Sequence, residues 1–550
     1  MKNVTKLAAV VLSATMMVSM TACNFKRDEQ EERDPNKTYL DVGNFNGGVG
    51  HAWLDEVAAA YMAEHPDVVV KVHNEKDKYG DTMLLENMGD YGNDMYFVAG
   101  ITLENFIARD KVANITDVVT ANLPNESESI ESKMDESLRD YYKRDDGQYY
   151  AVPFFDAIFG TIYDVDLFEQ EKLYFNTNGK LICDDPTNTT LSKGPNGLEG
   201  DFDDGLPATV TQWKTLLEGI TSFGVKPYMW SGQHKYNRQR WLASLWADYE
   251  GKANFDLNAT LSGTYTFAGD SEPTPITNEN GYLLQKQLGK KFALEMGEYI
   301  VDNNMYKSTS FDGTNSNTMA QNDYLLSVEA TKISSENPRV AMLFDAGWWE
   351  NEAKAFFDEM VSTYDNENYG FRKRKFGFMP APKADDGSSN AGTTLMSSTS
   401  NSAIFICKDT DVMDVAKDFL KFCHTDESLR TFTRVSGIVR PYDYTIEDSD
   451  RAQMSHFAEN VWDIYRSPNT EICHVTVFEN KAFTEQASFF NDGFVNESWW
   501  WKSKVGGIET TDAVYEFWQN KSLTAEQYYN GLQTTFSKSA WDSVMSKYYD

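Results

Sequence analysis

A strand–loop–helix–strand unit at residues 38–72 most constrains how this chain can fold. Residues 39–42 (YLDV) have the composition of a strand, and the flexible loop 43–50, which is rich in glycine, follows them. The next apolar residues recur at helical spacing until Pro66, and residues 68–72 form a second apolar run. Two strands joined by a helix predict an α/β sheet. The glycines lack GxGxxG spacing, so the loop is a weak candidate for dinucleotide binding.

A further apolar run, residues 340–344 (VAMLF), predicts a buried strand that ends in an aromatic turn. The chain passes through Asp345 and Gly347 into two adjacent tryptophans, Trp348 and Trp349. In open α/β sheets ligands bind beyond the carboxyl ends of the strands, so this turn is a candidate wall of a ligand site. The alternative is that the tryptophans are core residues, because Trp is highly buried on average. Adjacent side chains of an extended segment point in opposite directions, so we expect one of the two to pack inside.

Other aromatic side chains follow the same pattern. Residues 227–229 form a short apolar run that ends in Trp230, and Tyr236 follows soon after. Three consecutive tryptophans, residues 499–501, precede a Gly506-Gly507 turn near the end of the chain. With 13 Trp, 29 Tyr and 33 Phe, the chain has many flat faces for stacking as well as for its core.

The amino terminus has the pattern of an export signal. Lysines precede an apolar run at residues 7–20, which is too short to span a bilayer comfortably and fits a secretory signal. Residues 20–23 (MTAC) resemble a bacterial lipobox, which implies cleavage after residue 22 and lipidation of Cys23. We therefore expect a signal peptide at 1–22 and a flexible, lipid-anchored tether at 23–37.

Two polar segments, residues 166–207 and 254–280, interrupt the regular pattern and predict loop-rich insertions. The first contains Asp201, Asp203 and Asp204 before a glycine. Calcium ligation by these carboxylates is one interpretation, but the spacing does not fit an EF-hand, so a solvated turn is preferred. The cysteines show no CxxC spacing, so no metal site and no cofactor are predicted.

Charge and motifs exclude several functions. The net charge of −34 argues against nucleic-acid binding, which needs clustered Lys and Arg. The sequence has no GxSxG, HExxH or Walker motif, and its seven histidines are scattered. We therefore predict that the protein is not an enzyme.

Several segments, taken in order, resemble the extracellular solute-binding lipoproteins of bacterial ABC importers, in the cluster that includes maltodextrin-binding protein. The resemblance covers essentially the whole mature chain apart from the two polar insertions. The segments that carry it are FNGGVGHAWLDEVAAAYMAEHPDVVVKV, GNDMYFVAG, YYAVPFFDAIFGTIYDVDLF, PYMWSGQHKY, VAMLFDAGWWENE, FGFMPAP, AIFICKDTDVMDVAKDFLKFCHTDESLRTFT and RPYDY.

The resemblance implies an α/β, two-lobed periplasmic-binding-protein-like fold, with a ligand cleft between lobes joined by crossing strands. Lobe one is expected at residues 38–155 with 399–446, and lobe two at residues 156–398 with 447–550. The crossings are expected near Phe155 and Asp156, between residues 396 and 401, and between residues 442 and 448.

The resemblance also implies which residues contact a carbohydrate. Sugar rings stack on Trp and Tyr, whereas their hydroxyls need planar amide, carboxylate and guanidinium partners. For each polar residue the alternative is a contact within a lobe or at the hinge. The predicted ligand-binding residues are Asn46, Asp156, Trp230, Tyr236, Trp348, Trp349, Arg440 and Trp500.

The predicted function is reversible binding of a carbohydrate, expected to be an oligosaccharide, by lobe closure, and its delivery to ABC permease subunits. The protein is expected to be a monomer on the outer face of the cell membrane. Two other functions remain open: a surface adhesin or sensory partner that binds glycan without transport, and a binder of peptide or another polar solute.

A secreted glycoside hydrolase is the alternative from a different class. It requires two carboxylates on either side of the scissile bond, roughly 5 or 6.5–9.5 Å apart. Asp156, Asp345 and Glu350 are the candidates in cleft-like places, although no motif supports the pair.

Overall fold

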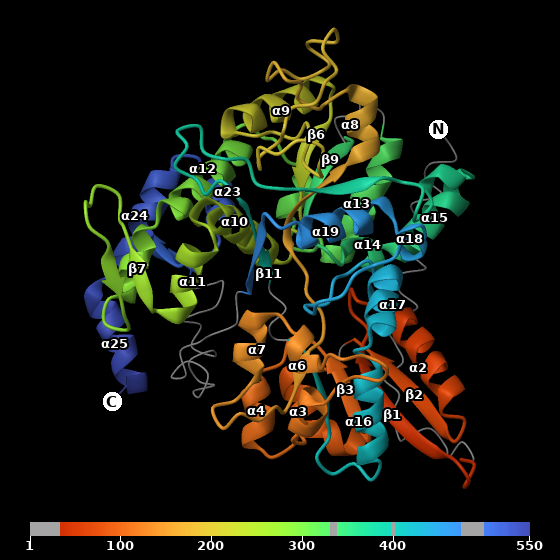
Figure 1. The fold of residues 1–550 in the computed structure, drawn as a ribbon. Helices are drawn as coiled ribbons and strands as arrows, with labels where there is room; N and C mark the ends of the chain where they lie inside the picture. Colours follow the sequence, from red (N-terminus) through yellow and green to blue (C-terminus); the bar gives the residue numbers. More distant parts are fainter. Residues whose placement is uncertain (1–32, 77, 331–337, 398–401, 475–499, 550) are drawn as a thin grey trace.

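The computed structural model describes residues 33–76, 78–330, 338–397, 402–474 and 500–549. The chain forms two α/β lobes, each built on its own sheet, which confirms the predicted fold class (Figure 1). Cys23 and the predicted signal peptide lie outside the described residues. Within the described ranges, no helix combines the length and the apolar character that a membrane crossing requires.

Lobe one is built on a five-stranded sheet of order β2-β1-β3-β12-β4. Strand β1 pairs in parallel with β2 and β3, whereas β12 is antiparallel to β3 and β4. The predicted strand–loop–helix–strand unit is confirmed as β1, α2 and β2. The strands are β1 (Thr38–Phe45), β2 (Val68–Glu75), β3 (Met95–Val98), β4 (Val152–Pro153) and β12 (Ala403–Ile406).

Helices cover this sheet because their apolar faces need a partner. Trp53 of α2 packs edge-on against Phe97 of β3 and Phe432 of α17, with ring centroids 5.5 and 4.9 Å apart. The helices of lobe one are α2 (Ala52–Glu64), α3 (Asp81–Tyr91), α4 (Leu103–Ala108), α5 (Thr116–Thr120), α6 (Ile130–Lys133), α7 (Glu136–Tyr142), α16 (Met413–Phe422) and α17 (Asp426–Ser436).

Lobe two is built on a four-stranded sheet of order β10-β5-β9-β6. All seven residues of β9 are buried, as expected for a central strand covered on both faces. The strands are β5 (Phe159–Asp164), β6 (Lys226–Met229), β9 (Val340–Ala346) and β10 (Phe376–Met379). The helices around them are α8 (Val165–Glu171), α9 (Val210–Ser222), α10 (Lys235–Glu250), α12 (Leu288–Asp302), α13 (Asn317–Leu326), α14 (Trp349–Glu352), α15 (Lys354–Tyr364), α19 (His456–Arg466) and α23 (Ala513–Gln519).

The second polar insertion and the C-terminal helices form an extension at the side of lobe two (Figure 1). They share a small apolar core, in which Trp541 of α25 donates its indole N–H to the carbonyl of Asn278 at 2.6 Å. The elements of this extension are α11 (Lys252–Thr260), β7 (Gly263–Tyr265), β8 (Thr274–Ile276), η1 (Gly281–Lys286), β14 (Ser503–Val505), β15 (Ile508–Thr510), α24 (Ala525–Thr535) and α25 (Lys538–Tyr549).

The chain passes between the two sheets after β4, before β12 and after α17. Strand β11 (Thr393–Ser397) pairs with β13 (Thr470–His474) beside these passages, and α18 (Asp448–Arg451) follows the last of them. Isolated bridges join Asp156 to Val439 and Ile158 to Ser397, so the passages are tied together. The residue bounds assigned to each lobe from the sequence stay a prediction.

Candidate ligand-binding cleft

A cavity of about 560 Å³ lies where the carboxyl ends of strands from both sheets face each other. Lobe one contributes the loop after β1, Lys76 after β2 and Gly100 after β3. Lobe two contributes the start of α10, after β6, and the turn after β9. Its volume falls within the roughly 300–1,000 Å³ of ligand pockets. The position agrees with the rule that α/β sheets bind ligands beyond their strand ends.

Trp348 forms part of the cavity wall, as the sequence predicted for one of the two tryptophans. Its half-buried ring packs edge-on against Phe159 and Phe155, with centroids 5.1 and 6.5 Å apart. Gly48 of lobe one approaches the ring so closely that a Cβ atom there would lie 2.7 Å from it. Trp348 therefore lies at the junction of the two lobes.

Tyr236, at the start of α10, also lines the cavity. Its hydroxyl accepts a hydrogen bond from the amide of Asn317, and the guanidinium of Arg240 lies 5.0 Å from the centre of its ring. Burial raises the pKa of Tyr236, so it stays a neutral phenol. Asn46 is half-buried between the lining residues Phe45 and Gly47. Contact of Tyr236, Asn46 and Trp348 with a ligand stays a prediction.

Two predicted contacts belong instead to the core of lobe two. Trp230 is 0% exposed and stacks on Phe344 of β9, with centroids 5.1 Å apart and ring planes 7° apart. Trp349 is also 0% exposed and lies edge-on to Phe376 and Phe457. The prediction that these tryptophans face the cleft is therefore wrong, because both side chains point into the lobe.

Trp500 is a third correction. It is buried and packs edge-on against Trp246 of α10, with centroids 5.4 Å apart, and Trp501 lies on the same ring at 5.9 Å. Both tryptophans therefore fill the core of lobe two rather than the cleft. The third member of the triplet, Trp499, lies outside the described residues.

Asp156 is a hinge residue in this structure rather than a cleft residue. Its buried carboxylate accepts hydrogen bonds from Ser397, from the hydroxyl of Tyr465 at 2.6 Å, and from Nε2 of His474 at 2.9 Å. Burial lowers the pKa of His474, but Asp156 and Asp135 together outweigh it, so the net shift of the pKa is upward. The prediction of a ligand contact is therefore corrected, because the carboxylate of Asp156 is hydrogen-bonded to residues near the crossings and not to the cavity.

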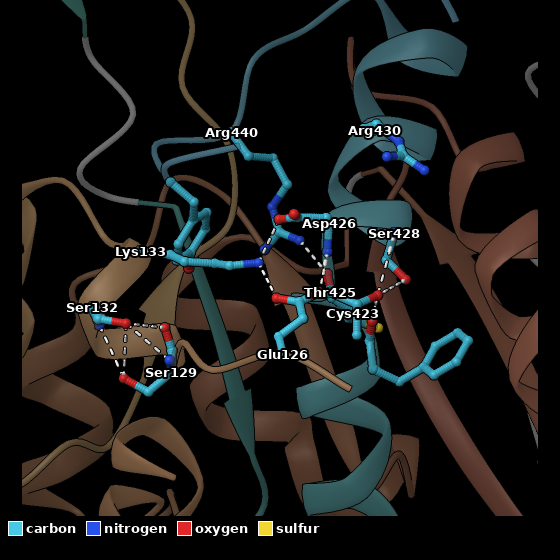
Figure 2. Close-up of polar contacts among 12 residues, drawn as sticks. Glu126, Ser129, Ser132, Lys133, Cys423, Thr425, Asp426, Ser428, Arg430 and Arg440 are labelled. Atoms are coloured by element: carbon cyan, nitrogen blue, oxygen red, sulfur yellow. Dashed lines mark hydrogen bonds and ion pairs between the residues drawn. The ribbon is translucent and has the colours of Figure 1, made fainter. Parts of the chain in front are cut away.

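The side chain of Arg440 is likewise buried and makes its hydrogen bonds within the protein. It is 0% exposed, and its guanidinium donates hydrogen bonds to the carbonyl oxygens of Phe154 at 2.8 Å and Cys423 at 2.9 Å. Figure 2 shows Arg440 and Lys133 pointing toward the same segment, where Lys133 pairs with Asp426. Arg440 therefore ties the crossing after β4 to the end of α16, and its predicted ligand contact is wrong.

The carboxylates considered for hydrolysis do not meet in the cavity. Asp345 is buried, and burial together with the nearby Glu352 raises its pKa to about 7. Glu350 is buried beside Ser455, and burial raises its pKa to about 8. Among the described residues that line the cavity, Glu352 is the one with a carboxylate. The pair that a glycosidase needs is therefore not assembled by these residues.

The raised pKa of Glu350 predicts a pH-dependent stability. A carboxyl group with a folded-state pKa of about 8 binds more protons in the folded state than in the unfolded chain, where the value is about 4.3. Stability should therefore fall as the pH rises through this window, between about 4 and 8. We expect Glu350→Gln to flatten the decrease in Tm between about pH 5 and pH 8, measured by calorimetry. An unchanged slope would show that Glu350 does not titrate in this range.

Sequence reasoning missed the polar residues that join or line the two walls. Lys76 pairs with Glu352 across the cleft at 3.2 Å, and Asn351 donates its amide to the carbonyl of Gly48 at 2.9 Å. His234 and Arg240 line the lobe-two side. Lys76 directly follows β2, so the strand-end rule that selected Asn46 and Trp348 could also have found it.

The structure brings one cluster of potential metal ligands together outside the cleft. The carboxylates of Asp201, Asp203 and Asp204 gather in the first insertion, and this is the one such cluster in the described residues. The described cysteines carry free thiols; they are Cys183, Cys407, Cys423 and Cys473.

Comparison with known proteins gives a family and a fold. The family model for the bacterial extracellular solute-binding protein matches residues 47–428. No curated protein matches the chain by sequence. One similar solved structure, from a study of xylan utilization by Caldanaerobius polysaccharolyticus, is 13% identical with a TM-score of 0.55; the match covers 91% of this chain and 100% of that one.

Two further structures have the same fold. A chitin oligosaccharide binding protein is 14% identical with a TM-score of 0.53, over 93% of this chain and 100% of that one. The GacH receptor of Streptomyces glaucescens, solved unliganded and with acarbose, is 13% identical with a TM-score of 0.52, over 93% of this chain and 99% of that one.

Proposed function

The chain belongs to the bacterial extracellular solute-binding proteins, and from this premise we propose that its solute is a carbohydrate, expected to be an oligosaccharide. The observation that supports this most is the wall of the cavity. Trp348 and Tyr236 supply two aromatic side chains, and Asn317, Lys76 and Glu352 supply hydrogen-bonding groups beside them. Sugars combine apolar ring faces with hydroxyl groups, and this wall matches both. The chitin oligosaccharide binding protein and the acarbose-bound receptor share the fold.

Binding is proposed to occur by closure of the two lobes. The contacts of Gly48 with Trp348, of Asn351 with Gly48, and of Lys76 with Glu352 all join one lobe to the other. A solute held between the lobes would add contacts that exist only in the closed arrangement. Closure also excludes water, which strengthens hydrogen bonds to the solute. The bound solute would then be delivered to the permease subunits of an ABC importer.

The proposal includes no chemical step. The described cavity wall holds the carboxylate of Glu352 without a second one, whereas glycoside hydrolysis uses two. We also propose that the protein works as a monomer outside the cytoplasm, held to the membrane by a lipid on Cys23 and tethered by residues 23–37. Mass spectrometry of the membrane fraction would test the lipid, and size-exclusion chromatography would test the monomer.

A thermal-shift panel tests the carbohydrate proposal. A ligand at 100 times its Kd should stabilise the folded protein by about 2.7 kcal/mol. We expect at least one oligosaccharide to raise the Tm, with peptides and amines as comparison ligands. If a peptide or amine raises the Tm and no saccharide does, the carbohydrate proposal fails. Chromatography after long incubation should recover the sugar intact, and shortened products would instead support a hydrolase.

A further inference from the structure

The first insertion contains a charged cluster that the solute cleft does not use. Residues 172–209 connect α8 to α9, at the end of lobe two that faces away from lobe one (Figure 1). Within this connection, the carboxylate oxygens of Asp201, Asp203 and Asp204 lie within 4.8 Å of one another. Three negative charges this close repel one another unless a cation or a proton compensates them.

Asp203 supplies the second, independent observation. The residue is 0% exposed, and its Oδ1 atom has no hydrogen-bond partner. The backbone of Gly194 approaches it so closely that a Cβ atom there would lie 2.6 Å from Oδ1. A buried carboxylate oxygen without a partner is costly, so its orientation needs an explanation.

The hydrogen bonds of the cluster follow one pattern. The Oδ2 atom of each aspartate accepts a hydrogen bond from an N–H group. The side-chain amide of Asn196 donates to Asp201 at 2.7 Å, and the backbone N–H of Asn196 donates to Asp203 at 3.0 Å. The backbone N–H of Gly200 donates to Asp204 at 2.8 Å. The Oδ1 atoms of Asp203 and Asp204 are both buried and have no such partner. Asp201 differs, because its Oδ1 accepts the backbone N–H of Asp203 at 3.4 Å. In Asp203 and Asp204 an N–H holds one oxygen and the other has no partner, as when outer hydrogen bonds orient metal ligands.

No positive side chain balances these carboxylates among the described ion pairs. The nearest lysine in sequence, Lys193, pairs instead with Glu199 at 3.7 Å. The described ion pairs therefore place no protein cation beside the three carboxylates.

We propose that Asp201, Asp203 and Asp204 bind a calcium ion. Ca²⁺ takes six to eight oxygen ligands at about 2.3–2.6 Å, so two of its ligands lie at most roughly 4.6–5.2 Å apart. The three carboxylates fall within this limit. The donor set contains oxygen alone, which suits calcium and not zinc or copper. Water and backbone carbonyl groups would have to supply the remaining ligands.

Calcium would add a further tie to a segment that has no helix or strand of its own. Residues 172–209 contain no helix or strand, and the isolated bridges there join Phe175 to Leu181 and Asn176 to Leu191. Loops of this length without secondary structure are uncommon in compact domains. An ion bound near the carboxyl end of the loop would fix Asp203 against Gly194 and so bring its two sides together. The expected role is structural and independent of the solute.

Calorimetry of the full chain tests the proposal directly. The protein is first treated with EDTA and dialysed, and its Tm is then compared without metal, with about 5 mM CaCl₂ and with the same concentration of MgCl₂. This concentration exceeds the roughly 10⁻⁴–10⁻³ M dissociation constants of extracellular calcium modules. We expect CaCl₂ to raise the Tm by several degrees and MgCl₂ to raise it by less than half as much. No shift with CaCl₂, or equal shifts with both salts, would overturn the proposal.

Asp203→Asn separates metal binding from an ordinary structural role. The amide has the size of the carboxyl group and carries no charge, so without metal the Tm should equal or exceed that of the unchanged protein, and the calcium shift should be lost. A purely structural aspartate would instead give a lower Tm with and without calcium. Asp201→Asn provides a second variant if the first does not fold. The matched control is Asp184→Asn, which alters an exposed carboxylate of the same insertion and should keep the full calcium shift.

Discussion

Replacing Trp348 with alanine is expected to lower the affinity for the solute by roughly 30- to 150-fold, while the protein stays folded. Aromatic residues at the centre of a binding site typically contribute about 2–3 kcal/mol when they are truncated. Trp348 is half-buried, lines the cavity and lies between the loop of Gly48 and the ring of Phe159. Its removal takes away a stacking face and also part of the contact between the lobes.

Titration calorimetry with a sugar identified by the thermal-shift panel measures this loss. Trp348→Phe should keep part of the affinity, because a smaller aromatic face remains. The Tm of both variants without solute should stay within a few degrees of the unchanged protein. Unchanged affinity in the alanine variant would remove Trp348 from the site, and unfolding would assign it to the core.

The sequence predicts the fold of this protein better than it predicts which side chains line the cleft. Residues 39–42 lie on β1 and residues 340–344 lie on β9, and both runs are largely buried because their composition favours burial. This local information suffices for an α/β assignment. The position of the cleft follows from the same strands, because ligand sites lie beyond their ends. Whether a side chain faces the cleft depends on how many residues separate it from the end of the strand, and a difference of one residue is enough to change the result.

Trp230 shows how that spacing misleads. It directly follows β6, so its side chain continues the strand and points back into the lobe, where it stacks on Phe344. Trp348 comes two residues after β9, beyond Gly347, where the chain has already turned. Both segments have the same appearance in the sequence, a short apolar run that leads to a tryptophan. The difference depends on where each strand ends, which composition does not define.

Arg440 could not have been assigned from local sequence. A guanidinium on a loop near a crossing is a plausible sugar ligand, but its partners are the backbone carbonyls of Phe154 and Cys423. Phe154 is 286 residues away in the chain. Such carbonyl acceptors have no sequence signature, because every residue carries one. Asp156 was likewise assigned to the cleft without knowledge of its distant partners. It pairs with His474, which is 318 residues away in the chain.

Replacing Trp349 with alanine should lower the stability of the protein and leave its affinity for the solute nearly unchanged, which is the reverse of the result expected for Trp348→Ala. Trp349 is 0% exposed and packs against Tyr324 of α13, Phe376 of β10 and Phe457 of α19, with centroids 5.8, 4.9 and 5.7 Å apart. Removing a buried tryptophan leaves a cavity that typically costs about 3–5 kcal/mol. For a lobe of this size, that loss corresponds to a decrease in Tm of roughly 6–20 °C.

The two neighbouring tryptophans thus form a matched pair for one experiment. Calorimetry without solute should show the large decrease in Tm for Trp349→Ala and a small one for Trp348→Ala. At a temperature where both variants are folded, titration with the sugar should show near-normal affinity for Trp349→Ala. If Trp349→Ala instead kept its Tm and lost affinity, the ring would have to face the solute, and the packing of α14 against β10 and α19 would be wrong. Trp349→Phe should recover part of the stability, because a ring still fills most of the space between these elements.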